Sequence, residues 1–232
     1  MITFNQIFNP YSLNIFTDAS MNSYQTIGCP GFVAVYGDVN KKFPLLKTSF
    51  KSILVPNHTN NYCEALAINM AIFEIINNRN FYSQIRIFSD SYITINGLNN
   101  SILNWRESKR VPGKVVGSQG IIKNQQIFME ILYNILQYRL PVQFFHQKGH
   151  VDFDENGLLK AEEVFCRTNG ITDRLEPDVV RAICYYNNYV DRQTRTMIYT
   201  SDLSTASYIN PLNYYYTGFD KDLYKELIHR RF

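Results

Sequence analysis

The sequence predicts an α/β fold, in which a mixed sheet carries helices on its faces. Three segments rich in β-branched and aromatic residues follow one another early in the chain, and strand-like and helix-like segments then alternate. The length of 232 residues suits one large globular domain with additions. Hydrophobic residues make up 45% and charged residues 19% of the chain, as expected for a protein with a buried core.

The elements are expected in the following order. The first three strands, at 12–20, 31–37 and 44–55, form an antiparallel meander. Apolar residues then repeat at helical spacing from 61 to 77, and a short apolar strand at 84–90 precedes a helix at 91–99. Segment 104–120 is basic and interrupted by Gly and Pro, so we expect a protruding loop or short helix. The last elements are a helix at 124–140, a strand at 141–147 and helices at 158–170 and 176–199.

Composition excludes several classes of protein. The net charge of +3 gives no overall basic character, so a nucleic-acid partner would have to bind a local patch. The cysteines lack CxxC spacing, which argues against structural zinc and favours free thiols in a reducing compartment; they are Cys29, Cys63, Cys166 and Cys184. The chain starts without a signal-peptide pattern and has no apolar run of roughly 20 residues. We therefore expect a soluble, cytoplasmic protein.

Four carboxylates lie on four different predicted elements. Asp18 stands among apolar and small residues of the first strand, where a charge is hard to explain. Asp90 could be an ordinary helix N-cap, and Glu64 could be an acid that favours the helix dipole. Asp191 could be a solvated residue of the last long helix.

Taken together, the four acids indicate a cation site. Neighbouring strands and the helices packed on them can bring these side chains to one place. Clustered carboxylates repel and raise one another's pKa unless cations neutralise them. Such a cluster suits hard divalent cations such as Mg²⁺, and a pair of these ions can clamp the oxygens of a phosphoryl displacement.

Five motifs then identify a family. "FTDAS", "TNNYCEALA", "FSDSYI", "KGH" and "NNYVDRQ" occur in the order typical of type 1 ribonuclease H, and the chain resembles that family over about residues 12 to 199. The resemblance implies a ribonuclease H-like fold, with a five-stranded mixed sheet in the order 3-2-1-4-5 and helices on both faces. It also implies a divalent-metal-dependent endoribonuclease that cleaves the RNA strand of RNA–DNA hybrids and leaves 3′-hydroxyl and 5′-phosphate ends.

The resemblance also assigns catalytic roles. Asp18, Glu64, Asp90 and Asp191 would hold two Mg²⁺ ions per site, with Mn²⁺ as a substitute. His150 matches a mobile histidine that assists proton transfer or product release, although a surface loop histidine is the alternative. His146 and His150 are four residues apart, but the predicted strand and loop do not favour a zinc site.

Hybrid contacts are implied at a second set of residues. Asn60 and Asn61 would contact minor-groove edges and the 2′-hydroxyl, while Thr59 would hold a DNA phosphate; all three could also cap the helix. Asn22 is a weaker contact, and Asn187 matches a polar position near the metals. The basic stretch matches a protrusion that grips the DNA strand, or it is a merely solvated loop; the residues concerned are Trp105, Arg106, Lys109, Arg110 and Lys114. For Trp105 we favour packing under the protrusion over stacking on a sugar.

The chain departs from the family pattern in one long segment. Residues 151–186 form a net acidic insertion, which could be a lid, a partner surface or a shield that narrows substrate choice. Ala19 replaces a usual glycine. We expect a ribonuclease H domain at 1–199, containing this helical insertion, and a Tyr-rich C-terminal extension at 200–232. The chain is expected to be a monomer, with the insertion or the extension available to a protein partner.

Two other functions stay open from the sequence. The chain could be another nuclease of the superfamily, such as a junction resolvase or a DNA nuclease, although "TNNYCEALA" and "KGH" argue against this. It could also be a non-catalytic module that binds nucleic acid or protein. Its four retained carboxylates favour an enzyme.

Overall fold

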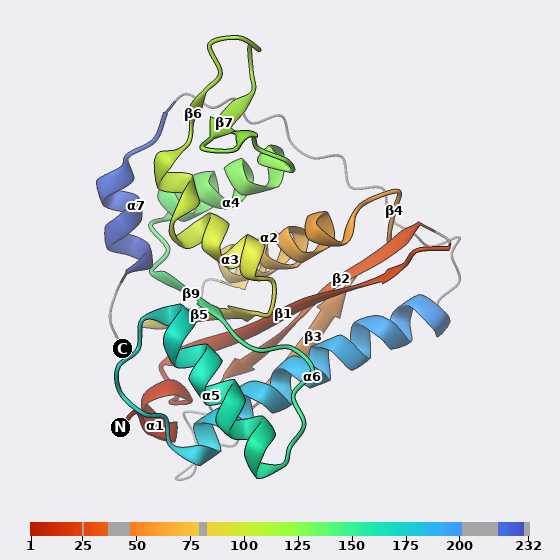
Figure 1. Ribbon diagram of the computed structural model, residues 1–232, viewed down its shortest axis with the longest axis vertical. Coiled ribbons are helices and arrows are strands. Elements are labelled where there is room, and N and C mark those ends of the chain that lie inside the picture. The colour runs from red at the N-terminus through yellow and green to blue at the C-terminus, as the bar shows by residue number, and fades with distance from the viewer. Residues whose placement is uncertain (25, 37–46, 79–82, 201–217, 230–232) are drawn as a thin grey trace.

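A central mixed sheet organises the protein (Figure 1). The computed structural model describes residues 1–24, 26–36, 47–78, 83–200 and 218–229. The main strands follow the order β3-β2-β1-β5-β9, and their bounds are β1 Ser12–Asn22, β2 Ile27–Tyr36, β3 Lys47–Ser52, β5 Gln84–Ser89 and β9 Val142–His146. β1, β2 and β3 pair antiparallel, whereas β5 runs parallel to β1 and β9 parallel to β5. This arrangement confirms the predicted order 3-2-1-4-5.

Helices cover both faces of the sheet because the central strands are apolar on both sides. In β1, Ile15 belongs to the core under α2 (Asn60–Asn78) and α4 (Gln125–Tyr138). The next residue, Phe16, points to the opposite core under α5 and α6, as expected from the alternation of side chains along a strand. Those two helices span α5 Glu155–Asn169 and α6 Pro177–Thr200. The α/β fold is confirmed, and β1 lies between the two cores and contributes side chains to both.

The helix ends follow the local chemistry of the sequence. Asp154 precedes α5 and accepts a 2.6 Å hydrogen bond from the Gly157 N–H, as an N-cap residue does. Gly170 ends the same helix in the left-handed region, with φ of 65°. Pro177 occupies the first position of α6, where its missing N–H costs nothing.

Three segments differ from the prediction. The stretch 104–120 is neither loop nor helix alone, because a 3-10 helix (Ser101–Asn104) leads into a small antiparallel sheet of β6 (Arg106–Glu107), β7 (Val115–Gly117) and β8 (Gly120–Ile121). Gly113 and Gly120, with φ of 72° and 109°, allow its tight turns. The third predicted strand begins at Lys47 and continues after a break as β4 (Val55–Pro56), while 44–46 lie outside the described residues. A short helix, α1 (Phe4–Ile7), was not expected.

Segment 151–186, predicted to be an insertion, and the C-terminal helix both pack onto the rest of the protein. α5 contacts β9 and α6. On the other face of the sheet, α3 (Tyr92–Asn99) contacts β9 and α2. Helix α7 (Lys221–Ile228) packs against α4 and β9, and the buried Tyr224 hydroxyl donates to the Leu98 carbonyl at 3.0 Å. Most of the Tyr-rich extension, residues 201–217, lies outside the described part. No helix among the described residues has the length and apolar character needed to cross a membrane.

Candidate active site

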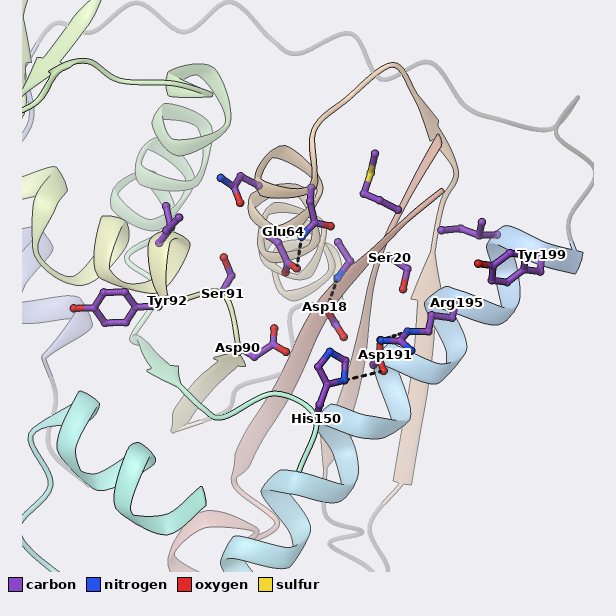
Figure 2. Close-up of a pocket in the computed structure, with 16 residues that line it drawn as sticks. Asp18, Ser20, Glu64, Asp90, Ser91, Tyr92, His150, Asp191, Arg195 and Tyr199 are labelled. Atoms are coloured by element: carbon purple, nitrogen blue, oxygen red, sulfur yellow. Dashed lines mark hydrogen bonds and ion pairs between the residues drawn. The ribbon is translucent and has the colours of Figure 1, made fainter. Parts of the chain in front are cut away.

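The four predicted carboxylates line one pocket, beside the second half of β1 and the carboxyl end of β5 and between α2 and α6 (Figure 2). Thr17 and Ser89 are paired across the parallel strands β1 and β5, so the residues that follow them, Asp18 and Asp90, lie side by side. Glu64 reaches the same place from α2, and Asp191 reaches it from α6 on the other face of the sheet. The topology therefore brings together residues that are far apart in the sequence.

Three of these acids form a tight group. One carboxylate oxygen each from Asp18, Glu64 and Asp90 lies within 4.8 Å of the other two, a spacing that fits a metal ion. Asp18 and Glu64 are both only 5% exposed. Among the described residues, Glu64 Oε2 is buried and has no hydrogen-bond partner. A buried carboxylate oxygen without a donor is costly unless a cation takes that position.

The electrostatics of the group support the same conclusion. Burial, followed by the charges of Asp90 and Asp191, raises the pKa of Asp18 well above its ordinary value. Burial and the charges of Asp18 and Asp90 raise the pKa of Glu64 in the same way. Two donors oppose this trend: the Ala19 N–H donates to Asp18 Oδ1 at 2.7 Å, and Asn60 lies 3.5 Å from Glu64 Oε1. Without a cation, the ionised cluster is unfavourable.

Asp191 stands at the edge of the cluster and has two partners of its own. Arg195 Nε lies 2.8 Å from Asp191 Oδ1, and His150 Nδ1 lies 3.7 Å from Asp191 Oδ2. Figure 2 shows both side chains pointing to this carboxylate. The His150 side chain is 69% exposed and its backbone has φ of 49°. The fold therefore places His150 and Asp191 next to each other although they are far apart in the sequence.

Asn187 and Gly149 both contact the Asp90 carboxylate. Burial raises the pKa of Asp90 above its ordinary value, and a hydrogen bond from the buried Asn187 opposes this shift. Gly149 of the "KGH" motif packs directly on the Asp90 carboxylate, since a Cβ at this glycine would lie 2.3 Å from Asp90 Oδ2. Ser91, not Asp90, occupies the N-cap position of α3. The ordinary N-cap explanation for Asp90 is therefore wrong.

The segment before α2 combines capping with exposure at the pocket. Thr59 Oγ1 accepts from the Tyr62 N–H at 3.3 Å and so caps the helix, as the simpler explanation expected. Asn60 and Asn61 are exposed and line the pocket. These two amides are therefore open to a bound substrate.

The remaining predicted contacts lie outside the pocket lining. Asn22 stands at the end of β1, where its Oδ1 accepts from the Tyr24 N–H at 3.1 Å. Four basic side chains are exposed on the hairpin 106–114, which extends away from the main sheet beyond α4 (Figure 1); we call it the basic hairpin, and its basic residues are Arg106, Lys109, Arg110 and Lys114. Trp105 is only 4% exposed and packs edge-on against Phe128 beneath the hairpin, which confirms the favoured packing and corrects its assignment as a hybrid contact.

The structure adds site residues that the sequence reasoning missed. Arg195 lines the pocket, and its position four residues after Asp191 on a helix was a signal for an ion pair. Tyr92 and Ile93 also line the pocket, and their side chains are 55% and 64% exposed. Ser20 and Thr194 share a 2.9 Å hydrogen bond that joins β1 to α6, one helical turn after Asp191. No spacing in the sequence pointed to these last contacts.

Comparisons with known proteins give one matching family model and several similar solved structures. The family model for RNase H matches residues 10–161. Among solved structures, RNase H1 from the halophilic archaeon Halobacterium salinarum is 13% identical, with 59% of this chain and 86% of that chain covered and a TM-score of 0.42. LC9-RNase H1, a type 1 RNase H with the type 2 active-site motif, is 13% identical, with 90% and 97% covered and a TM-score of 0.48.

LC11-RNase H1 in complex with an RNA/DNA hybrid is 15% identical, with 68% of this chain and 96% of that chain covered and a TM-score of 0.40. No match was found among curated proteins. The family model covers more than half of the sequence, and its match begins before Asp18 and ends after His150. The chain therefore belongs to the RNase H family.

Proposed function

We propose that the protein is an endoribonuclease that hydrolyses the RNA strand of RNA–DNA hybrids with the help of divalent cations. The observation that carries the proposal is the convergence of Asp18, Glu64, Asp90 and Asp191 on one open pocket in a chain of the RNase H family. Nothing in an ordinary helix cap or a solvated helix face requires these four acids to share a pocket.

The acids fit a pair of Mg²⁺ ions, for which Mn²⁺ could substitute. Asp18, Glu64 and Asp90 would provide the closest ligand atoms, with Asp191 at the edge. Bound there, the ions would supply an activated water and stabilise the charge that develops on the leaving oxygen, which gives 3′-hydroxyl and 5′-phosphate ends. The buried and unpartnered Oε2 of Glu64 supports this ligand set.

His150 is placed to handle the proton of the reaction. Its Nδ1 faces Asp191, so its Nε2 is left for solvent or for the oxygen that leaves the phosphate. Because 69% of the side chain is exposed, the imidazole can exchange its proton with water. In this role Asp191 orients the ring through the contact with Nδ1.

Recognition of the hybrid would be divided between two parts of the surface. Asn60 and Asn61, beside Glu64, can donate to and accept from the ribose 2′-hydroxyl that distinguishes RNA from DNA. Thr59 at the N-terminus of α2 suits a phosphate, and Asn22 is placed farther out on β1. The exposed cations of the basic hairpin would bind phosphates of the DNA strand, with an affinity that falls as salt increases.

Segment 151–186, the predicted insertion, lies away from the pocket lining. No residue of 151–186 lines the pocket, which argues against a lid or shield over the carboxylates. Its α5 packs on β9 and α6, and its outer face is the surface that remains for a protein partner. A monomer in the cytoplasm is the simplest setting for the proposed activity.

The test is cleavage of one labelled RNA in three forms: paired with DNA, paired with RNA and single-stranded. A DNA duplex of the same sequence is the fourth substrate, and each is incubated with Mg²⁺, with Mn²⁺ and with EDTA. We expect metal-dependent cleavage of RNA only in the hybrid. Cleavage of the DNA duplex would favour another nuclease of the superfamily, and a folded protein that cuts nothing would favour a binding module.

A further inference from the structure

Two buried side-chain amides lie next to Asp90, outside the pocket lining. Gln147, which follows β9, is 2% exposed, and Asn187 of α6 is 1% exposed. Gln147 Nε2 donates a hydrogen bond to Asn187 Oδ1 at 2.5 Å. Neither residue lines the pocket, so a direct contact with substrate does not explain the pair.

The hydrogen bond decides which end of the Asn187 amide faces Asp90. An asparagine amide has an acceptor oxygen and a donor NH₂ group. Because Gln147 engages the oxygen, the NH₂ group is left for Asp90, and the Asn187 side chain does hydrogen-bond that carboxylate. A turned amide would present its oxygen to a carboxylate that only accepts, and the two groups would repel.

Gln147 is also anchored to the strand that carries Asp90. Its backbone N–H donates to the Ser89 carbonyl at 3.0 Å, directly before Asp90. Its side chain then crosses to α6, the helix of Asp191. Among the described residues, Gln147 Oε1 is buried without a hydrogen-bond partner. An unsatisfied buried oxygen costs stability, and an apolar side chain at this position would avoid that cost.

We propose that Gln147 is a positioning residue, which holds the Asn187 amide with its NH₂ group toward Asp90 and so keeps the Asp90 carboxylate oriented for a divalent cation. The proposal rests on the proposed function, because Asp90 must be a metal ligand. It extends to this chain the general behaviour of metal sites, in which residues behind the ligands fix the orientation of the ligands.

A double-mutant cycle tests this chain of contacts. Gln147→Met removes the donor with little change in length, and Asn187→Leu removes the amide that it orients. Mg²⁺ binding is measured by calorimetry without substrate, and the Mg²⁺ dependence of hybrid cleavage is measured separately. We expect Gln147→Met to weaken Mg²⁺ binding about tenfold, which is the lower end of the effect seen when residues that support metal ligands are mutated. Most of kcat should be recovered at saturating Mg²⁺. In the Asn187→Leu background, Gln147→Met should have no further effect.

Gln143→Met is the matched control. Gln143 is also a buried glutamine, 6% exposed, but it lies at the opposite end of β9, paired in register with Arg86. This variant should keep the wild-type affinity for Mg²⁺. If Gln147→Met does not fold, Gln147→Leu removes the same donor.

Two results would overturn the proposal: an unchanged Mg²⁺ affinity in folded Gln147→Met, or effects of the two substitutions that simply add. A different failure is also recognisable. A wild-type protein that neither binds Mg²⁺ nor cuts hybrid would overturn the proposed function itself, and the inference with it.

Discussion

Gly149→Ala should disable the site through a single methyl group. An alanine Cβ at this position would lie 2.3 Å from Asp90 Oδ2 and 3.1 Å from its Cγ, whereas ordinary contacts begin at 3.4 Å. Gly149 does not have a positive φ, so the substitution brings a clash and no special backbone strain. The Asp90 carboxylate or the "KGH" loop must therefore move by about 1 Å. A misplacement of about 1 Å in a catalytic constellation can lower the rate about 100-fold.

The assay is single-turnover cleavage of an RNA–DNA hybrid at saturating enzyme, together with hybrid binding in the absence of divalent cations. We expect the rate to fall about 100-fold while binding stays close to wild type. Gly157→Ala is the control, because its Cβ would also clash, here with the backbone carbonyl of Asp152 in the insertion. It should lower thermal stability but leave the rate of the folded enzyme unchanged. A Gly149→Ala enzyme with wild-type activity would refute the close packing of the glycine on Asp90.

Three further perturbations concern the Asp90 carboxylate, the buried acids and the basic hairpin. Asp90→Asn should abolish Mg²⁺-dependent cleavage while the protein stays folded and still binds hybrid; retained cleavage would remove Asp90 from the ligand set. Without metal, the free energy of unfolding should fall as the pH rises from the ordinary carboxyl range through the raised pKa values of Asp18 and Glu64. In this pH range the folded state still holds protons that the unfolded chain has lost, so rising pH favours unfolding. Asp18→Asn should flatten this pH dependence in thermal melts, and Mg²⁺ should offset the loss at the high-pH end; an unchanged slope would contradict the coupled cluster. Replacing the four cations of the basic hairpin by alanine should weaken hybrid binding. The slope of log affinity against log salt should fall by about one for each phosphate that the protein no longer neutralises. The single-turnover cleavage rate at saturating enzyme should not change.

The sequence predicted the parts of the site that depend on chain order. Asp18 on a strand and Asp90 just after another must become neighbours once the two strands pair in parallel, and β1 and β5 do so. Helical periodicity located Glu64 and Asp191 on helices that pack on either side of the sheet. The strand order itself followed from the family resemblance, since local patterns do not specify which strands pair.

Other features depend on side-chain contacts that no local pattern specifies. The bond between Gln147 and Asn187 joins residues 40 positions apart, and the sequence reasoning missed the role of Gln147. The acids of the insertion suggested a partner surface, yet several have internal partners. Glu162 pairs with Arg174 at 3.1 Å, and Glu176 accepts from the Phe4 N–H at 2.6 Å. Net charge alone could not distinguish these structural carboxylates from exposed ones.

The most direct test of the central claim is the chemistry of the cut ends. RNA labelled at either end is cleaved in the hybrid with Mg²⁺, and the new termini are identified by enzymatic treatment and mass spectrometry. Hydrolysis by cations held at Asp18, Glu64, Asp90 and Asp191 predicts 5′-phosphate and 3′-hydroxyl ends, with no cleavage in EDTA. Ends with a 2′,3′-cyclic phosphate, formed equally well in EDTA, would show attack by the RNA's own 2′-hydroxyl and would contradict the account.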